Sequence, residues 1–160
     1  MSYDGKAMSV RPATPADADA GSRVLQRSIT ELCKRDHGDD AAVIAAWTAN
    51  KTPEHWHVWL ARSDTSIFVA ECDGSIVGVG MVDGTGVILL NYVAPEARYS
   101  GVSTALLHAM EKVSCQRGIV VCTLESTKTA ESFYIARGYV PTDGGGSTIF
   151  VKHLPPGPAP

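Results

Sequence analysis

The chain lacks any long hydrophobic run, although 44% of its 160 residues are hydrophobic. A helix that crosses a bilayer needs about 20 consecutive apolar residues, and no segment approaches this length. Residues 1–7 also lack the apolar core of a secretory signal. We therefore expect a cytoplasmic protein that does not act at a membrane.

A surplus of positive charge is also missing. The 14 lysines and arginines are outnumbered by 17 acidic residues, the net charge is −3, and the basic residues are scattered. A protein that binds nucleic-acid phosphates presents a clustered basic surface, so nucleic acid is not the expected partner. A dinucleotide site is disfavoured because residues 98–103 lack the three-glycine fingerprint and no acidic residue stands in the ribose position.

Cysteine is scarce and unclustered. The four cysteines are Cys33, Cys72, Cys115 and Cys122, and three of them lie in apolar-periodic segments. This pattern favours reduced, buried thiols over disulfides or a metal site. We expect no metal, and catalysis by cysteine is the less favoured alternative.

The sequence does contain alternating strand and helix patterns. Thr14-Pro15 is typical of a helix start, and an apolar stripe predicts that this helix continues to about Arg35. Asp73-Gly74 between two β-rich runs predicts a hairpin. Helices are expected at 14–35, 41–49, from 52 onward, 101–117 and 127–137, and strands at 9–13, 66–72, 75–82, 87–93, 119–124, 139–142 and 148–153.

The order β-α-α-β-β-β-α-β-α-β-β predicts an α/β fold with a mixed, mostly antiparallel twisted sheet and helices on both faces. We expect one domain over residues 1–154 and a loose tail at residues 155–160. The single strand-to-helix crossover in the middle is the point where parallel strands splay and leave backbone accessible to a ligand.

Residues 87–110 form the most informative segment. They combine an apolar strand, a polar turn with an arginine and a glycine, and the start of an amphipathic helix. The first amides of a helix are unpaired, and its dipole adds roughly half a positive charge. This segment therefore predicts a site that holds a diphosphate mainly through backbone N–H groups.

Four local features carry a resemblance to a known family. They are Val10-Arg-Pro-Ala-Thr-Pro-Ala-Asp17, the strand end Val93-Ala-Pro95, the loop Arg98-x-x-Gly101-x-Ser103, and the helix Ala130-x-x-Phe133-Tyr134-x-x-x-Gly138-Tyr139. In this order and spacing, the chain from about Ser9 to Leu154 resembles the Gcn5-related N-acetyltransferase (GNAT) family.

The resemblance implies acetyl transfer from acetyl-CoA, as co-substrate, to an amine. It implies that the backbone of Asn91, Tyr92 and Val93 pairs with the pantetheine arm like a missing strand. Thr127 stands where the family commonly has an asparagine, and Tyr134 would lie beside the thioester sulfur as general acid. The diphosphate would be held by Arg98, Tyr99, Ser100, Gly101, Val102, Ser103 and Thr104.

Elementary chemistry agrees with these roles. A phenol with an ordinary pKa near 10 can protonate a leaving thiolate at pH 7, and the Val93 N–H is a candidate donor to the developing oxyanion. Attack requires a neutral amine, so either a base removes its proton through water or the site binds the deprotonated fraction. Glu125, just after a strand beside the cleft, is the first candidate base. The others are Asp83, Glu31 and His37.

Each interpretation has a structural alternative. Gly101 also fits an ordinary strand-to-helix turn, and Phe133 and Tyr134 also fit the core face of an amphipathic helix. The acids Glu31, Asp36, Asp39 and Asp40 either attract a cationic amine or form a solvated loop. Tyr99, Ser100 and Ser103 depart from the family pattern and give the loop less positive charge, so we expect modest cofactor affinity.

The leading hypothesis is an N-acetyltransferase that moves the acetyl group to a primary amine of a small molecule or an exposed peptide amine. The alternative is an acyl-CoA-binding regulatory module with little or no turnover. Dimers are common among similar domains, so a homodimer is a further expectation.

Overall fold

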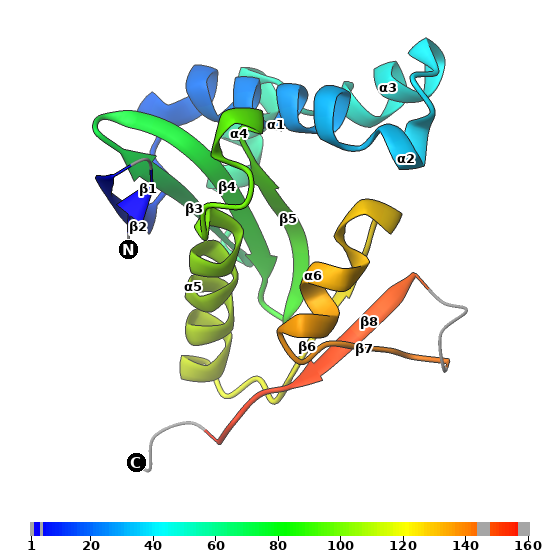
Figure 1. The fold of residues 1–160 in the computed structure, drawn as a ribbon. Coiled ribbons are helices and arrows are strands. Elements are labelled where there is room, and N and C mark those ends of the chain that lie inside the picture. Colours follow the sequence, from blue (N-terminus) through cyan, green and yellow to red (C-terminus); the bar gives the residue numbers. More distant parts are fainter. Residues whose placement is uncertain (1, 4, 144–147, 157–160) are drawn as a thin grey trace.

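The computed structural model describes residues 2–3, 5–143 and 148–156 (Figure 1). In this part of the chain, eight strands form a sheet in the order β1-β2-β3-β4-β5-β6-β8-β7. The strands are β1 (Ser2–Tyr3), β2 (Lys6–Pro12), β3 (Thr65–Cys72), β4 (Ser75–Asp83), β5 (Val87–Val93), β6 (Val121–Glu125), β7 (Val140–Pro141) and β8 (Ile149–His153). The α-helices are α1 (Ala18–Leu32), α2 (Lys34–His37), α3 (Ala41–Thr48), α4 (Pro53–Ala61), α5 (Val102–Gln116) and α6 (Glu131–Ala136), and the 3-10 turns are η1 (Pro15–Asp17), η2 (Pro95–Ala97) and η3 (Lys128–Ala130).

Helices cover both faces of the sheet. α1 packs on β4 and β5 from one side, with α3 and α4 beside it, and α5 packs on β3, β4 and β5 from the other side (Figure 1). Leu25 of α1, Val79 of β4 and Leu106 of α5 are fully buried. All strand pairs are antiparallel except β5 with β6. The predicted mixed, mostly antiparallel sheet with helices on both faces is confirmed.

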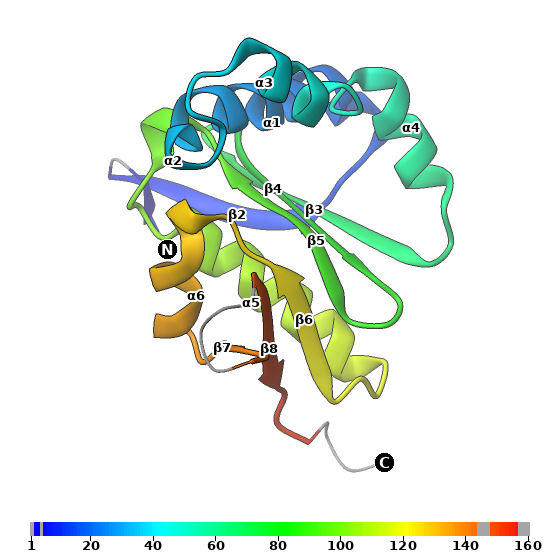
Figure 2. The same ribbon diagram turned by 90° about the vertical axis from the view of Figure 1, so that its right-hand side faces the viewer.

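The parallel pairing of β5 and β6 is short. It consists of Val87 with Thr123 and Ile88 with Leu124. On the other side, β4 shifts register, because Met81 pairs with Leu90 and Val82 with Ile88, which leaves one extra residue in β5. Beyond this bulge β5 and β6 separate (Figure 2). The splay predicted at the crossover is therefore present.

The first long helix is interrupted, contrary to the prediction of one helix from residue 14 to Arg35. Residues 15–17 form the 3-10 turn η1, α1 ends at Leu32, and Cys33 leaves helical geometry with φ −99° and ψ 29°. His37 in α2 is buried and its Nε2 lies 2.8 Å from the Ile29 carbonyl oxygen. The imidazole therefore satisfies a carbonyl in the last turn of α1, and α2 folds back against α1.

Other differences lie at the ends of elements. The short strand β1 was not predicted, and the last helix divides into η3 and α6. The predicted tail at 155–160 and the glycine run 144–146 lie wholly or partly outside the described residues. No described helix is long and apolar enough to cross a membrane. All four cysteines are free, and Cys33, Cys72 and Cys122 are buried, as predicted.

Two glycines in β4 let α5 approach the sheet closely. A Cβ atom on Gly78 would lie 2.6 Å from Val102 Cγ1 and 2.9 Å from Leu106 Cδ1. A Cβ atom on Gly80 would meet the end of the Met110 side chain, at 3.0 Å from Cε. Valine is stiff at χ1 and methionine is flexible, so the two positions differ in their tolerance of a methyl group.

We expect Gly78→Ala to lower the free energy of unfolding by about 1–3 kcal/mol, the usual cost of an overpacked core. The matched control is Gly80→Ala in the same strand, which should cost less because Met110 can move. Chemical denaturation measures both. Equal losses in the two variants would contradict the inference that the close approach of Val102 to Gly78 fixes the position of α5.

Candidate active site

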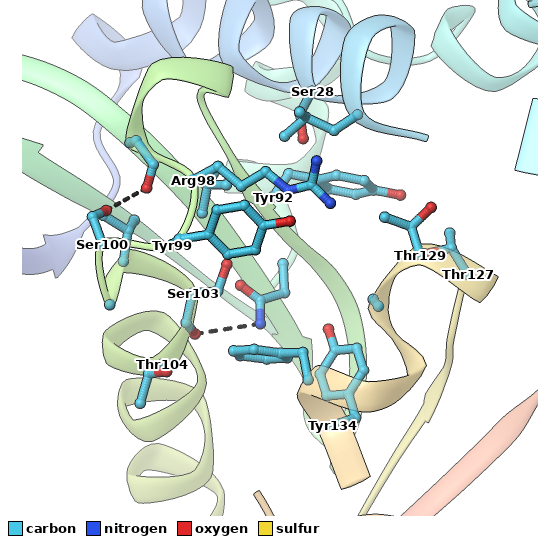
Figure 3. Close-up of a pocket in the computed structure, with 18 of the residues that line it drawn as sticks. Ser28, Tyr92, Arg98, Tyr99, Ser100, Ser103, Thr104, Thr127, Thr129 and Tyr134 are labelled. Atoms are coloured by element: carbon cyan, nitrogen blue, oxygen red, sulfur yellow. Dashed lines mark hydrogen bonds between the residues drawn. The ribbon is translucent and has the colours of Figure 1, made fainter. Parts of the chain in front are cut away.

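A cavity of about 580 Å³ opens where β5 and β6 separate. Leu32 and Cys33 from the end of α1 border it, and η3 and α6 form another wall. Every residue predicted to bind the cofactor lines this cavity, and so does Tyr134 (Figure 3). These residues are Asn91, Tyr92, Val93, Arg98, Tyr99, Ser100, Gly101, Val102, Ser103, Thr104 and Thr127.

The loop between β5 and α5 presents backbone amides to the cavity. Tyr99 and Gly101 have positive φ values of 63° and 88°, which turn the chain sharply before α5. The Ser100 hydroxyl donates to the Ala97 carbonyl and holds this turn. Helix geometry leaves the N–H groups of Val102, Ser103 and Thr104 without an acceptor inside the helix. The loop and helix start thus have a geometry that is suited to binding an anion.

The β5 edge of the cavity carries an unused acceptor. The Asn91 Nδ2 donates to the Ser103 carbonyl oxygen at 3.4 Å, which ties β5 to the start of α5. The Asn91 Oδ1 is buried and accepts no hydrogen bond within the described part of the chain. A buried acceptor without a donor is costly, and a ligand with an amide N–H would satisfy it.

Tyr134 projects its hydroxyl into the cavity (Figure 3). The residue is 7% exposed, and its ring packs edge-on against Phe133 and Tyr139 at centroid distances of 5.0 and 5.6 Å. Burial raises the pKa of Tyr134 to about 12, whereas a hydrogen bond from Asn91 acts in the opposite direction. The phenol therefore keeps its proton at neutral pH, as a general acid requires. Tyr134 is both a core aromatic and a cavity residue, so the two sequence interpretations are compatible.

Cys33 borders the same cavity. Burial, with the charge of Asp36 nearby, raises the pKa of the Cys33 thiol to about 11. A thiol that stays protonated at neutral pH is a poor nucleophile. The site therefore does not favour catalysis by this cysteine.

Arg137 is a cavity residue that the sequence analysis missed. Its Nε donates to Thr104 Oγ1 and its Nη1 to the Phe133 carbonyl, each at 3.0 Å, and the guanidinium lies 4.0 Å from the centroid of the Phe133 ring. These contacts fix a cation between the start of α5 and the end of α6. Ser28, Thr129 and Ser132 also line the cavity and were missed. No local motif marks such residues, because the fold brings them to the cavity from segments that are distant in the sequence.

Asp36 of α2 connects the N-terminal helices to the 3-10 turn η3, which directly precedes α6. Its carboxylate accepts hydrogen bonds from the Lys128 N–H at 2.6 Å, the Thr129 N–H at 3.4 Å and the Thr129 Oγ1 at 2.8 Å. Residue 36 thus caps η3 in place of the local residue Thr127, whose side chain makes no cap hydrogen bond. This contact spans more than 90 residues of sequence and closes one wall of the cavity.

The candidate bases lie outside this cavity lining. Glu125 is exposed at the end of β6, and its Oε1 accepts from Thr148 Oγ1 at 3.4 Å. Asp83 accepts from Thr85 and Val87 and holds the turn before β5. Glu31 lies 3.8 Å from Arg27 on the same helix. His37 uses both ring nitrogens, since Nδ1 accepts from the Asp39 N–H at 3.0 Å and Nε2 donates to Ile29.

Comparison with known proteins identifies the family. A family model described as an acetyltransferase (GNAT) domain matches residues 31–155. The chain therefore belongs to the GNAT family of acetyltransferases, as the sequence resemblance indicated. A comparison with curated proteins found no significant match.

Solved structures share the fold over nearly the whole chain. A GCN5-related N-acetyltransferase from Rhodopseudomonas palustris is 26% identical, with a TM-score of 0.82 and coverage of 96% of this chain and 99% of that one. PaiA N-acetyltransferase from Thermoplasma acidophilum, in complex with coenzyme A, is 22% identical, with a TM-score of 0.79 and coverage of 92% and 99%. A GNAT family acetyltransferase from Brucella melitensis, in complex with acetyl-CoA, is 15% identical, with a TM-score of 0.67 and coverage of 96% and 92%.

The role of Asp36 can be tested by replacing its charge. We expect Asp36→Asn to speed hydrogen exchange of the Lys128 and Thr129 amides several-fold, because charge-assisted hydrogen bonds are the stronger ones. The matched control is Asp39→Asn, since Asn also tolerates the positive φ of 59° at that exposed position. Equal exchange of these two amides in wild type and Asp36→Asn would show that the cap contributes little.

Proposed function

We propose that the protein transfers the acetyl group of acetyl-CoA to a primary amine of a small molecule or a peptide. The observation that carries this proposal is one cavity that joins a helix start with free amides, an open strand edge and a buried, protonated tyrosine. The structural neighbours from T. acidophilum and B. melitensis hold coenzyme A and acetyl-CoA, respectively. These complexes support acetyl-CoA as the co-substrate.

The residues present fit this co-substrate. The amides of Val102, Ser103 and Thr104, with the Arg98 and Arg137 guanidinium groups, would hold the diphosphate. The β5 edge at residues 91–93 would pair with the pantetheine arm, and the free Asn91 Oδ1 would accept a hydrogen bond from one of its amides. Thr127 borders the same cavity and would offer a hydroxyl where family members offer an asparagine amide.

In this proposal the protein donates one proton and stabilises one developing negative charge. The acceptor nitrogen attacks the thioester carbonyl carbon, a C–N bond forms and the C–S bond breaks. Tyr134 donates its proton to the departing sulfur, and the Val93 N–H would stabilise the developing oxyanion. Glu125 lies outside the lining, and this scheme assigns it no contact with the reacting atoms.

The acceptor classes named for two structural neighbours differ widely. One neighbour is the ribosomal-protein-S18-alanine N-acetyltransferase from Escherichia coli, and another is an aminoglycoside 6'-acetyltransferase. They are 15% and 16% identical to this chain, so they share its fold alone. Both small molecules and peptides therefore belong in the acceptor panel.

Removing the Tyr134 hydroxyl tests the general acid. We expect Tyr134→Phe to lower kcat for thiol release about 100-fold or more, the usual contribution of a positioned acid, with acetyl-CoA affinity changed only a few-fold. The matched control is Tyr99→Phe, because the Tyr99 side chain also borders the cavity but is 89% exposed. Thiol release is followed with an amine panel.

Two outcomes would count against this scheme. Equal thiol release by wild type and Tyr134→Phe would remove Tyr134 from the mechanism. Tight acetyl-CoA binding in calorimetry without thiol release from any amine would favour the regulatory module with little or no turnover.

The second cation in the cavity can be tested by binding alone. We expect Arg137→Gln to weaken coenzyme A binding about 10-fold or more, since hydrogen bonds to charged groups contribute about 1.5–3 kcal/mol. Arg62→Gln is the matched control, because Arg62 pairs with Asp64 away from the cavity lining. Calorimetry with coenzyme A at two salt concentrations measures the effect. Unchanged affinity would show that Arg137 only joins α5 to α6.

A further inference from the structure

We infer that the acceptor is an amine that is already uncharged when it binds, of the class of the peptide α-amino group rather than a lysine side chain or a polyamine. The inference rests on the proposed acetyltransferase function and names its substrate class. Two observations carry it: the cavity lining offers no base, and the acidic side chains nearest to it are already engaged.

The cavity lining holds no aspartate, glutamate or histidine among the described residues. Its ionisable side chains are Cys33, Tyr92, Tyr99, Tyr134, Arg98 and Arg137. Burial raises the pKa values of Cys33, Tyr92 and Tyr134, so these three groups keep their protons and cannot accept another. Tyr99 is 89% exposed, and an arginine stays protonated at any working pH. Residues 144–147, which are not described, are three glycines and a serine and supply no ionisable side chain.

The side chains of the N-terminal helices that could bind a cation already have partners within the fold. Asp36 caps η3, and Asp40 caps α3 by accepting from the Ala42 and Val43 N–H groups at 2.9 and 3.2 Å. His37 is held at both ring nitrogens, and Glu31 lies beside Arg27. Asp36, His37 and Asp40 are therefore held by hydrogen bonds of the scaffold, and the exposed Glu31 carboxylate is shared with Arg27.

Several charged groups on neighbouring segments also lie outside the cavity lining. Asp39, Glu125 and Lys128 are exposed, and Glu131 is partly exposed in the first turn of α6. A carboxylate outside the lining can interact with the acceptor amine only through intervening solvent water. The site is thus built to deliver a proton from Tyr134 and not to remove one from an ammonium group.

Proton balance is satisfied when the acceptor arrives neutral. The amine lone pair forms the C–N bond, Tyr134 protonates the sulfur as the C–S bond breaks, and the proton that the nitrogen releases returns to the Tyr134 oxygen. At pH 7, about 14% of an α-amino group with a pKa of about 7.8 is neutral, against about 0.04% of a lysine with a pKa of about 10.4. The difference in reactive fraction is about 300-fold.

The test uses two peptides of one sequence that contains a single lysine. In the first the lysine amine is blocked and the N-terminus is free, and in the second the N-terminus is blocked and the lysine is free. We expect kcat/KM for thiol release to favour the first peptide by up to about 300-fold at pH 7 and about 70-fold at pH 8.5. For each peptide, the plot of kcat/KM against pH should bend at the pKa of its own free amine.

Glu125→Gln and Glu131→Gln complete the design, and both should change these profiles less than two-fold. Equal use of the two peptides at pH 7 would overturn the inference. A bend below pH 7 that both peptides share and that Glu125→Gln removes would also overturn it, because it would identify a base on the enzyme. Thiol release from neither peptide nor any other amine, with coenzyme A binding intact, would instead overturn the proposed function and this inference with it.

Discussion

The separation of β5 from β6 after Ile88 is the constraint on which the rest of the site depends. The two strands pair at Val87 and Ile88, and the extra residue in β5 then bends it away. A continuous parallel pair would bury the β5 edge against β6 and leave no cavity. Because the pair ends early, the sheet has two arms, and α5 and α6 can border one opening between them (Figure 2).

The position of α5 turns this opening into an anion site. Gly78 lets Val102 sit against β4, and the positive φ of 88° at Gly101 directs the chain into the helix at that point. Asn91 then ties β5 to the Ser103 carbonyl. The strand edge and the helix amides are therefore held in a fixed relation before any ligand binds, which lowers the entropy cost of binding.

Much of this arrangement could be predicted because its signals are local. Asp73-Gly74 marks the hairpin, and both residues have positive φ in the structure, as such a turn requires. The segment from β5 to α5 carries its turn residues and its apolar helix face within one stretch of sequence. The family resemblance then added Thr127 and Tyr134, which local patterns alone leave ambiguous.

The features that sequence could not predict depend on contacts between distant segments. Asp36 caps a turn that follows β6, and Arg137 reaches the start of α5 from the end of α6. The break at Cys33 likewise has no proline or glycine to mark it, and it accompanies the burial of His37 against Ile29. The same contacts explain why acids that look suited to binding a cation in the sequence serve as helix caps in the fold. Residue type alone left two interpretations of these acids, attraction of a cationic amine or a solvated loop, whereas the hydrogen bonds of Asp36 and Asp40 place these two residues in the scaffold.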